Sequence, residues 1–82
     1  MITSRRGEAA SADIERWAKE IIAAVDPRAD ASVYHDADSS TYVVRLARAS
    51  RVLVFRFSEA QIYTPERDKE CEKTLKTKLK NL

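Results

Sequence analysis

Residues 41–58 read TYVVRLARASRVLVFRFS, and this stretch decides the fold. Side chains two residues apart share one face of a β-strand, so the alternation predicts two antiparallel strands with one apolar face. A shift of the pairing by one residue would bring Arg56 onto that face, where an unpaired charge is costly. The register is therefore well specified. The predicted apolar face consists of three opposed pairs: Tyr42 with Phe57, Val44 with Phe55, and Leu46 with Leu53.

The turn of this hairpin lies within residues 48–51. In the predicted register Arg48 faces Arg51, which leaves Ala49 and Ser50 between them. Two-residue hairpin turns favour Asn or Gly, and neither is present. We therefore expect a four-residue loop over residues 48–51, which keeps the same pairing.

The length and composition indicate one small folded domain. The chain has 82 residues, of which 44% are hydrophobic and 34% charged, as in a globular protein rather than a disordered one. A chain of this size buries only about 60–65% of its unfolded surface. We predict a flexible N-terminal arm over residues 1–7 and a single α+β domain over residues 8–82.

The composition also excludes several kinds of site. Gly7 is the only glycine, whereas phosphate loops and dinucleotide fingerprints need several glycines. A single cysteine forms no intramolecular disulfide and gives no metal-ligand spacing. The N-terminus lacks the apolar run of a secretory signal, and no stretch approaches the roughly 20 apolar residues of a membrane span. We expect a cytoplasmic protein without cofactor or metal.

The pattern before the hairpin predicts a helix and a short strand. Ser11 is the expected N-cap of the helix, although an earlier start is open because residues 8–10 are also helix-compatible. Asp26-Pro27 stops the helix because a residue before proline leaves helical geometry. Residues 31–35 are the expected strand, with Val33 inward and Tyr34 partly over the outer face, although the opposite orientation is also open. The apolar stripe of the helix consists of Ile14, Trp17, Ala18, Ile21 and Val25.

The pattern after the hairpin predicts a helical turn and then a long helix. We expect residues 58–63 to leave the sheet through one helical turn, anchored by Ile62 or Tyr63. Thr64 is the expected N-cap of the long helix, and Pro65 suits its first position. At helical spacing, one side of this helix is an apolar seam of Cys71, Leu75, Leu79 and Leu82. The opposite side is a basic ridge of Lys69, Lys73, Lys76 and Lys80.

Together these elements predict an α+β fold of order α-β-β-β-α, with a three-stranded antiparallel sheet and both helices packed on one face. This topology resembles that of the double-stranded-RNA-binding domain. The Gly-Pro-x-His segment of that family has no counterpart in residues 36–40, which read DADSS. Its lysine cluster has none in residues 65–69, which read PERDK. The resemblance therefore concerns topology and implies no function.

The sheet face opposite the helices is the first candidate site. Its uncovered position predicts an exposed apolar strip with charged ends, and such patches often mark a partner surface. We therefore expect a protein partner or a second copy of the chain to bind here. The alternative is that β-branched residues simply favour strands even where water reaches them. The candidate residues are Val43, Arg45, Val52, Val54 and Arg56.

The basic ridge is the second candidate site. Residues 1–41 hold five Arg or Lys and eight Asp or Glu, whereas residues 42–82 hold ten and five. Lysines in a line could contact successive phosphates, with help from the hairpin arginines. Glu66, Glu70 and Glu72 lie beside the ridge, however, and a run of lysines is often only a solvated face. Nucleic-acid binding is therefore the alternative function.

The sequence predicts no catalytic constellation. His35, Asp36 and Asp38 lie in a serine-rich turn, where the carboxylates more readily cap the backbone than hold a metal. Cys71 falls on the apolar seam, so we expect a buried thiol with a raised pKa rather than a nucleophile. We predict a non-enzymatic domain that works by binding.

Overall fold

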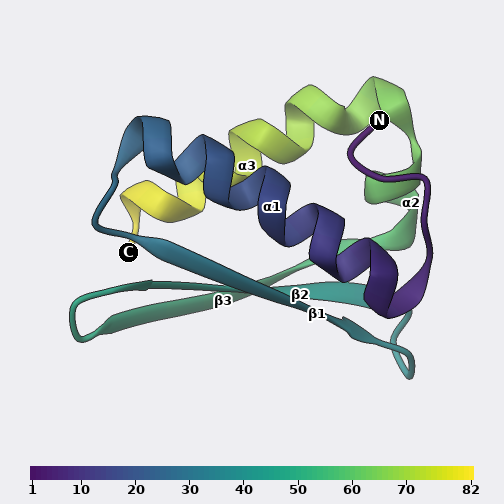
Figure 1. Cartoon of the computed structure of the whole chain (residues 1–82), viewed down its shortest axis with the longest axis horizontal. Helices are drawn as coiled ribbons and strands as arrows, with labels where there is room; N and C mark the ends of the chain where they lie inside the picture. Colours follow the sequence, from purple (N-terminus) through teal and green to yellow (C-terminus); the bar gives the residue numbers. More distant parts are fainter.

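A computed structural model describes all of residues 1–82 and confirms the α+β fold of order α-β-β-β-α (Figure 1). The predicted helical turn after the hairpin is also present. The elements are α1 (Gly7–Val25), β1 (Asp30–Asp36), β2 (Thr41–Arg48), β3 (Arg51–Ser58), α2 (Glu59–Tyr63), the 3-10 turn η1 (Pro65–Arg67) and α3 (Asp68–Lys80).

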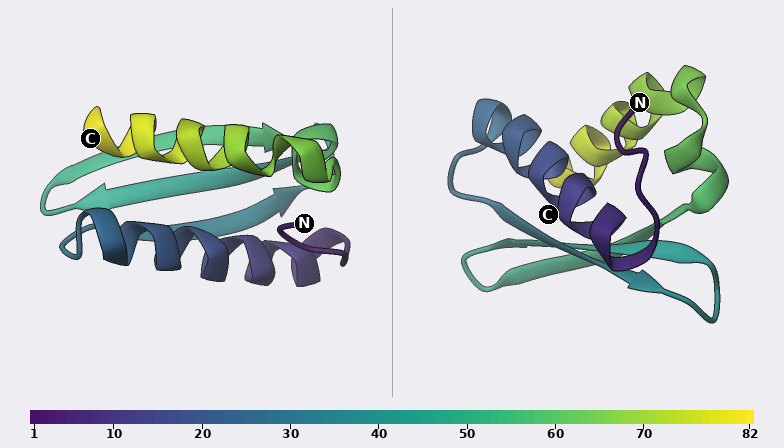
Figure 2. Two further views of the ribbon diagram at one scale, coloured as in Figure 1. Left: turned by 90° about the horizontal axis from the view of Figure 1, so that it is seen from above. Right: turned by 45° about the vertical axis from the view of Figure 1, so that its right-hand side comes forward.

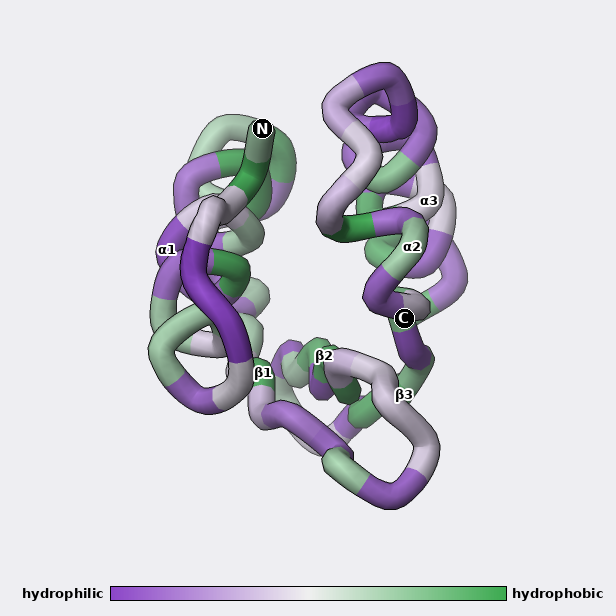
Figure 3. The backbone as a smooth tube through the Cα atoms, turned by 90° about the vertical axis from the view of Figure 1, so that its right-hand side faces the viewer, coloured by the Kyte–Doolittle hydropathy of each residue, from purple (hydrophilic) through white to green (hydrophobic).

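The three strands form one antiparallel sheet in the order β1-β2-β3. The predicted register is confirmed, since Tyr42 faces Phe57, Val44 faces Phe55 and Leu46 faces Leu53. Both long helices lie on the same face of this sheet (Figure 2). Viewed end-on, α1 runs above β1 and α3 runs above β3, and no element covers the opposite face (Figure 3). We call this opposite face the outer face.

The core lies between the helices and the sheet, and each element contributes to it. Phe57 is fully buried and makes edge-to-face contacts with Trp17 and Phe55, with ring centroids 6.1 and 5.2 Å apart. Val33 packs inward against this core and Tyr34 faces outward, which confirms the preferred orientation of β1. The predicted seam of α3 is also confirmed, because Cys71, Leu75, Leu79 and Leu82 are all buried.

The helix α1 begins before Ser11, at Gly7, which is the earlier start that the sequence left open. Ser11 is not the N-cap: it lies buried inside the helix, and its hydroxyl donates to the carbonyl of Gly7 at 3.4 Å. The chain enters the helix at Gly7, whose φ of 62° suits the only glycine. The extension by five residues, 7–11, brings Ala10 into the core, and the centre of the buried stripe moves accordingly. The most buried positions are Ala10, Ile14, Ala18 and Ile22, whereas Trp17 and Ile21 are partly buried and Val25 is exposed.

The N-terminal residues lie along the start of α1 and reach α3. Thr3 is buried, and its hydroxyl donates to Asp13 Oδ2 at 2.6 Å. Arg5 holds the same carboxylate through two donors, at 2.9 and 2.6 Å. The Met1 amine lies 2.7 Å from Asp68 Oδ2 at the start of α3. The flexibility of this arm stays a prediction.

The connection from β3 to α3 is made by capped turns. Ser58 and Gln61 form a capping box at the start of α2, with reciprocal hydrogen bonds of 2.8 and 3.1 Å. Ile62 is fully buried and anchors this turn, as predicted. The side chain of Thr64 makes no capping bond, so that prediction was wrong. The Thr64 carbonyl accepts instead from Arg67 N–H at 2.9 Å, which closes η1 before α3 begins.

The hairpin turn differs from the predicted four-residue loop. The strands continue through Arg48 and Arg51, which face each other, so only Ala49 and Ser50 form the turn. Ala49 accommodates this tight turn with a φ of 54°, a conformation that residues with a Cβ adopt at a cost. The guanidinium of Arg48 forms hydrogen bonds with Asp26 and with the carbonyl of Leu82, and these bonds anchor the end of β2.

Replacing Ala49 with glycine should therefore stabilise the protein by up to about 1 kcal/mol, since the roughly 1–2 kcal/mol of strain relieved at this φ exceeds the roughly 0.4–1 kcal/mol lost through the more flexible unfolded chain. In a domain of this size the melting temperature should rise by roughly 4–8 °C, which thermal unfolding followed by circular dichroism would measure. Ser50→Gly is the matched control, because Ser50 lacks a positive φ and its replacement should bring no gain. Equal effects of the two changes would contradict the assignment of strain to Ala49.

Candidate functional site

The outer face of the sheet follows from the strand register. Directly opposed residues point to the same side of a sheet. The outer face therefore contains four rows across β1, β2 and β3: Asp36, Thr41 and Ser58; Tyr34, Val43 and Arg56; Ser32, Arg45 and Val54; and Asp30, Ala47 and Val52. These rows bring together all five residues that the sequence predicted for this site.

The exposure of these side chains corrects the predicted site in one position. Val52 and Val54 on β3 are 51% and 57% exposed, as expected for an open face. Val43 is only 1% exposed, so its prediction as an accessible residue was wrong. It lies on the central strand between Tyr34 and Arg56, and these two long side chains flank it from both neighbouring strands.

Tyr34 replaces Val43 as an accessible part of the surface. Its side chain is 54% exposed and shares the outer face with Val54 and Val52. The sequence placed Tyr34 over the outer face but did not include it in the candidate site. The alternation of a strand predicts which face a side chain takes, but it does not predict how exposed that side chain is. We use the name outer surface for five exposed residues of this face, namely Tyr34, Arg45, Val52, Val54 and Arg56; Asp30 and Ser32 on β1 are exposed on the same face.

Arg56 is tied to the turn between β1 and β2. Its Nη1 atom lies 2.9 Å from Asp36 Oδ2, 3.2 Å from Ser39 Oγ and 2.9 Å from Thr41 Oγ1. Hydrogen bonds from Arg56 and then from Ser39 hold the pKa of Asp36 below its usual value. Asp36 also accepts from the backbone N–H of Asp38 at 3.2 Å, as predicted for a carboxylate that caps its own turn. Arg45, by contrast, is exposed and forms no ion pair.

The basic ridge lies on the far side of the molecule from the outer surface. The buried seam of α3 faces the sheet, so Lys69, Lys73, Lys76 and Lys80 point away from it and are exposed. Lys76 pairs with Glu72 at 3.0 Å, and the other three lysines have no ion-pair partner. Arg45 and Arg56 point in the opposite direction, below the sheet. The ridge and the hairpin arginines therefore do not form one continuous basic surface.

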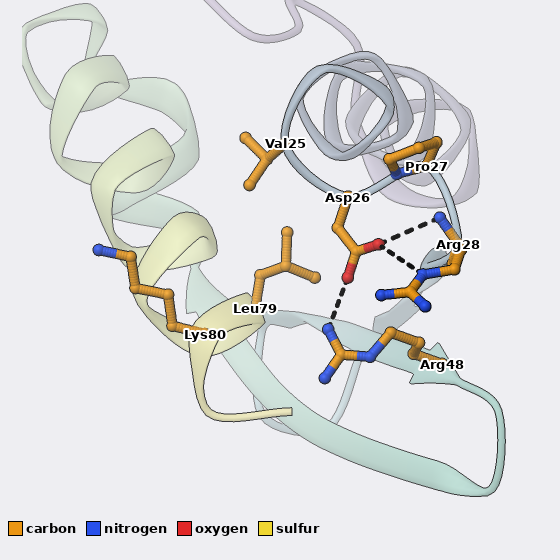
Figure 4. A pocket seen from close by; sticks show the side chains of 7 residues that line it. All are labelled: Val25, Asp26, Pro27, Arg28, Arg48, Leu79 and Lys80. Atoms are coloured by element: carbon orange, nitrogen blue, oxygen red, sulfur yellow. Dashed lines mark hydrogen bonds and ion pairs between the residues drawn. The ribbon is translucent and has the colours of Figure 1, made fainter.

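An open depression of about 420 Å³ lies where the end of α1 meets the end of α3 (Figure 4). The charged side chains Arg48 and Asp26 of this depression pair with each other, with Arg48 Nη1 2.5 Å from Asp26 Oδ2. Arg48 Nη2 also donates to the carbonyl of Leu82 at 2.8 Å. Arg28 approaches the same carboxylate through its backbone N–H at 3.2 Å and its Nε at 3.8 Å. The hydrogen bond from Arg48 lowers the pKa of Asp26. This cluster fastens three chain segments together.

Aromatic residues and one histidine form a polar network near the start of α1. His35 Nε2 lies 3.3 Å from Glu59 Oε2, and its ring packs on Tyr42 with centroids 4.8 Å apart. The hydroxyls of Tyr42 and Tyr63 are hydrogen-bonded to each other, and Tyr63 also donates to the Arg5 carbonyl at 2.9 Å. Burial raises the pKa of Tyr42. His35 and Asp36 point to opposite faces of β1 and do not form a joint site.

Cys71 lies in the core as predicted. It is fully buried, and its thiol donates to the Gln61 carbonyl at 3.6 Å. Burial, followed by the nearby charges of Asp68 and Glu70, raises the pKa of Cys71 to about 11. A thiol of this kind is a weak nucleophile at neutral pH, because only the thiolate is reactive.

The element order keeps its resemblance to the double-stranded-RNA-binding domain, and proteins with one topology can differ in function. None of the helices combines the length and the apolar character that a membrane span needs. No protein-family model, no curated protein and no solved structure matches this chain.

Proposed function

We propose that this chain is a small non-enzymatic cytoplasmic domain that binds another protein chain through its outer surface. The observation that carries this proposal is the position of the exposed apolar residues. Of the five large hydrophobic residues that are exposed, three lie on the outer face: Val52 and Val54 on β3, and Tyr34 on β1 at the other side of the sheet.

The composition of the outer surface supports a protein partner. Protein interfaces are enriched in tyrosine and arginine, and a polar or charged rim commonly surrounds their apolar centre. Here Val52 and Val54 are the apolar centre, with Tyr34 beyond Val43 and with Arg45 and Arg56 beside them. Both valines are about half exposed in the free protein, so a partner that covers them gains part of the roughly 1.5–3 kcal/mol that full burial of each side chain contributes.

Binding rather than catalysis fits the polar groups of the protein. The buried thiol of Cys71 has a raised pKa, and His35 is held between Glu59 and the Tyr42 ring. The three aspartates whose pKa is lowered, Asp13, Asp26 and Asp36, each join segments of the chain through arginine. These groups therefore support the fold.

The alternative proposal is nucleic-acid binding through the basic ridge. Three of its lysines are exposed without an ion-pair partner, which supports contact with phosphates. The hairpin arginines lie on the opposite side of the sheet, so one rigid duplex could not contact both sets. The alternative therefore depends on the ridge alone.

Selection from a displayed library of random peptides would test the main proposal with the full-length protein. Peptides that bind the natural chain should bind a Val52→Ser/Val54→Ser variant at least about tenfold more weakly, because the apolar contact is lost. A Lys69→Ser/Lys73→Ser variant is the matched control and should bind them unchanged. Selected peptides that bind all three proteins equally would contradict the outer surface as the binding site.

Two further measurements separate the other possibilities. Light scattering over a range of protein concentrations tests whether the partner is a second copy, and a strictly monomeric protein would exclude this. Binding to RNA and DNA duplexes at two salt concentrations tests the ridge, since phosphate contacts weaken steeply with salt. Duplex binding that is lost in a Lys73→Glu/Lys76→Glu/Lys80→Glu variant would favour the alternative function.

A further inference from the structure

We infer that the free edge of β3 binds an acidic extended segment of another protein, which pairs with it as a fourth strand. This inference rests on the proposed function, because it specifies how a partner engages the outer surface. It depends on three features of the structure: which backbone groups β3 leaves unpaired, which side chains accompany them, and which charges surround them.

The unpaired backbone groups follow from one hydrogen bond at the other edge. Val33 N–H donates to Glu15 Oε1 at 2.9 Å and so points away from β2. Its opposed residue Val44 must therefore direct its backbone groups toward β3, where they pair with Phe55. Successive residues of a strand alternate in this direction. The backbone N–H and C=O groups of Val52, Val54 and Arg56 consequently face outward from the sheet.

These outward groups have no partner within the protein. The backbone hydrogen bonds outside the helices and strands involve only residues 22–29, 64–67 and 78–82. At the end of the strand, Ser58 N–H donates to the side-chain oxygen of Gln61, so the free edge ends there. The β1 edge differs, because α1 packs beside it and Glu15 accepts from Val33. Folded proteins usually protect an edge with proline, a bulge or charged side chains. β3 has no proline and no bulge, and its charged residues are Arg51 and Arg56, of which Arg56 is paired with Asp36.

The residues with free backbone groups also carry the exposed valines. Val52 and Val54 are both more than half exposed on the outer face. A strand that pairs with β3 would place alternate side chains beside them, so main-chain hydrogen bonds and apolar contacts would form together. This combination is how added strands are recognised, with affinity from the backbone and specificity from alternate side chains.

Charge identifies the occupant as acidic. Residues 41–58 contain four arginines and no carboxylate. Arg48 and Arg56 have partners within the protein, whereas Arg45 and Arg51 have none. Lys78 lies over the Phe55 ring on the helix side of the edge, 5.9 Å from its centroid, and is also unpaired. A second copy of β3 would bring the same cations to the junction. An added strand that packs β-branched residues against Val54 would place alternating glutamates on the helix side, where they would neutralise Arg51 and Lys78.

The test uses the full chain and a synthetic peptide of alternating glutamate and valine. Peptide binding should slow amide hydrogen exchange at Val54 and Arg56, as followed by NMR, because their N–H groups become paired. A peptide of alternating lysine and valine is the matched control and should bind at least about tenfold more weakly. Binding without protection of these amides would overturn edge pairing, and no binding of the glutamate peptide would overturn the acidic occupant.

A proline variant tests the backbone contact separately. Val54→Pro removes one outward N–H at an edge position, where proline is tolerated, and should weaken peptide binding about tenfold relative to Val54→Thr. Circular dichroism checks that both variants are folded, and the exchange measurement on the natural chain does not depend on them. Equal affinity of the two variants would overturn edge pairing.

The failure of this inference can be told apart from failure of the proposed function. If library peptides depend on Val52 and Val54 but leave the edge amides unprotected, the outer surface binds through side chains and the edge inference is wrong. If the edge amides become protected with rising protein concentration alone, the occupant is a second copy, which overturns the acidic segment. If duplex RNA binds without protecting the edge amides, Arg45, Arg51 and Lys78 contact nucleic acid, which also overturns the acidic segment.

Discussion

Replacing Phe57 with alanine should lower the free energy of unfolding by about 3–5 kcal/mol. The Phe57 ring is fully buried, with Trp17 of α1 on one side and Phe55 on the other. Its loss would open a cavity at the point where the sheet meets α1, and the surrounding aromatic rings cannot collapse fully into it. Small domains have a total stability of only about 5–15 kcal/mol, so the variant should be largely unfolded well below the natural melting temperature.

Urea unfolding at 25 °C measures this difference, and Val54→Thr is the matched control. Val54 points to the outer face, opposite the core, and is exposed, so its replacement should change the stability by less than about 0.5 kcal/mol. Comparable losses from the two substitutions would show that the outer face is also buried in solution, for example between two copies.

The protein should also lose stability in acid. Asp13, Asp26 and Asp36 each have a pKa below the usual value in the folded state, chiefly through hydrogen bonds from Arg5, Arg48 and Arg56. A lowered pKa means that the unfolded chain binds protons more readily than the folded one. Stability is therefore fully present above the ordinary aspartate pKa of about 4 and decreases as the pH falls below it.

The midpoint of urea unfolding, measured from pH 7 to pH 2.5, would test this dependence. Asp26→Asn should be less stable at neutral pH, and its stability should depend less on pH below about 4, because one titrating group is gone. Asp38→Asn is the control, since Asp38 is exposed and its side chain forms no ion pair. If Asp26→Asn and the natural chain lost stability in parallel, the pairing of Asp26 with Arg48 would not contribute to acid sensitivity.

Much of the fold could be predicted because its signals are local. The alternation in residues 41–58 determines which face each side chain takes, since a slip of the pairing by one residue would bring Arg56 onto the core face. The seam of α3 follows from helical spacing, and all four of its predicted residues are buried. Errors arose at element ends, as at Ser11 and Thr64, where a favourable capping residue is present but the chain satisfies its hydrogen bonds in another way.

The candidate site was only partly predictable, because exposure depends on neighbours that are distant in sequence. Val43 is a valine on the outer face, like the exposed Val52 and Val54. It is buried because it lies on the central strand, where Tyr34 of β1 and Arg56 of β3 flank it. The role of Glu15 was also hidden, since a glutamate on the wet side of a helix gives no sign that it accepts from a strand 18 residues away.

The sequence by itself determined the class of fold, the pairing within the hairpin and the apolar seam of α3. Each of these depends on a period of two or about 3.6 residues, which a short stretch contains in full. Only the tertiary structure decided that α1 covers the β1 edge and that β3 is left open. The reason is that an edge is free or covered according to which elements lie beside it, and this is a property of the packed chain rather than of the strand.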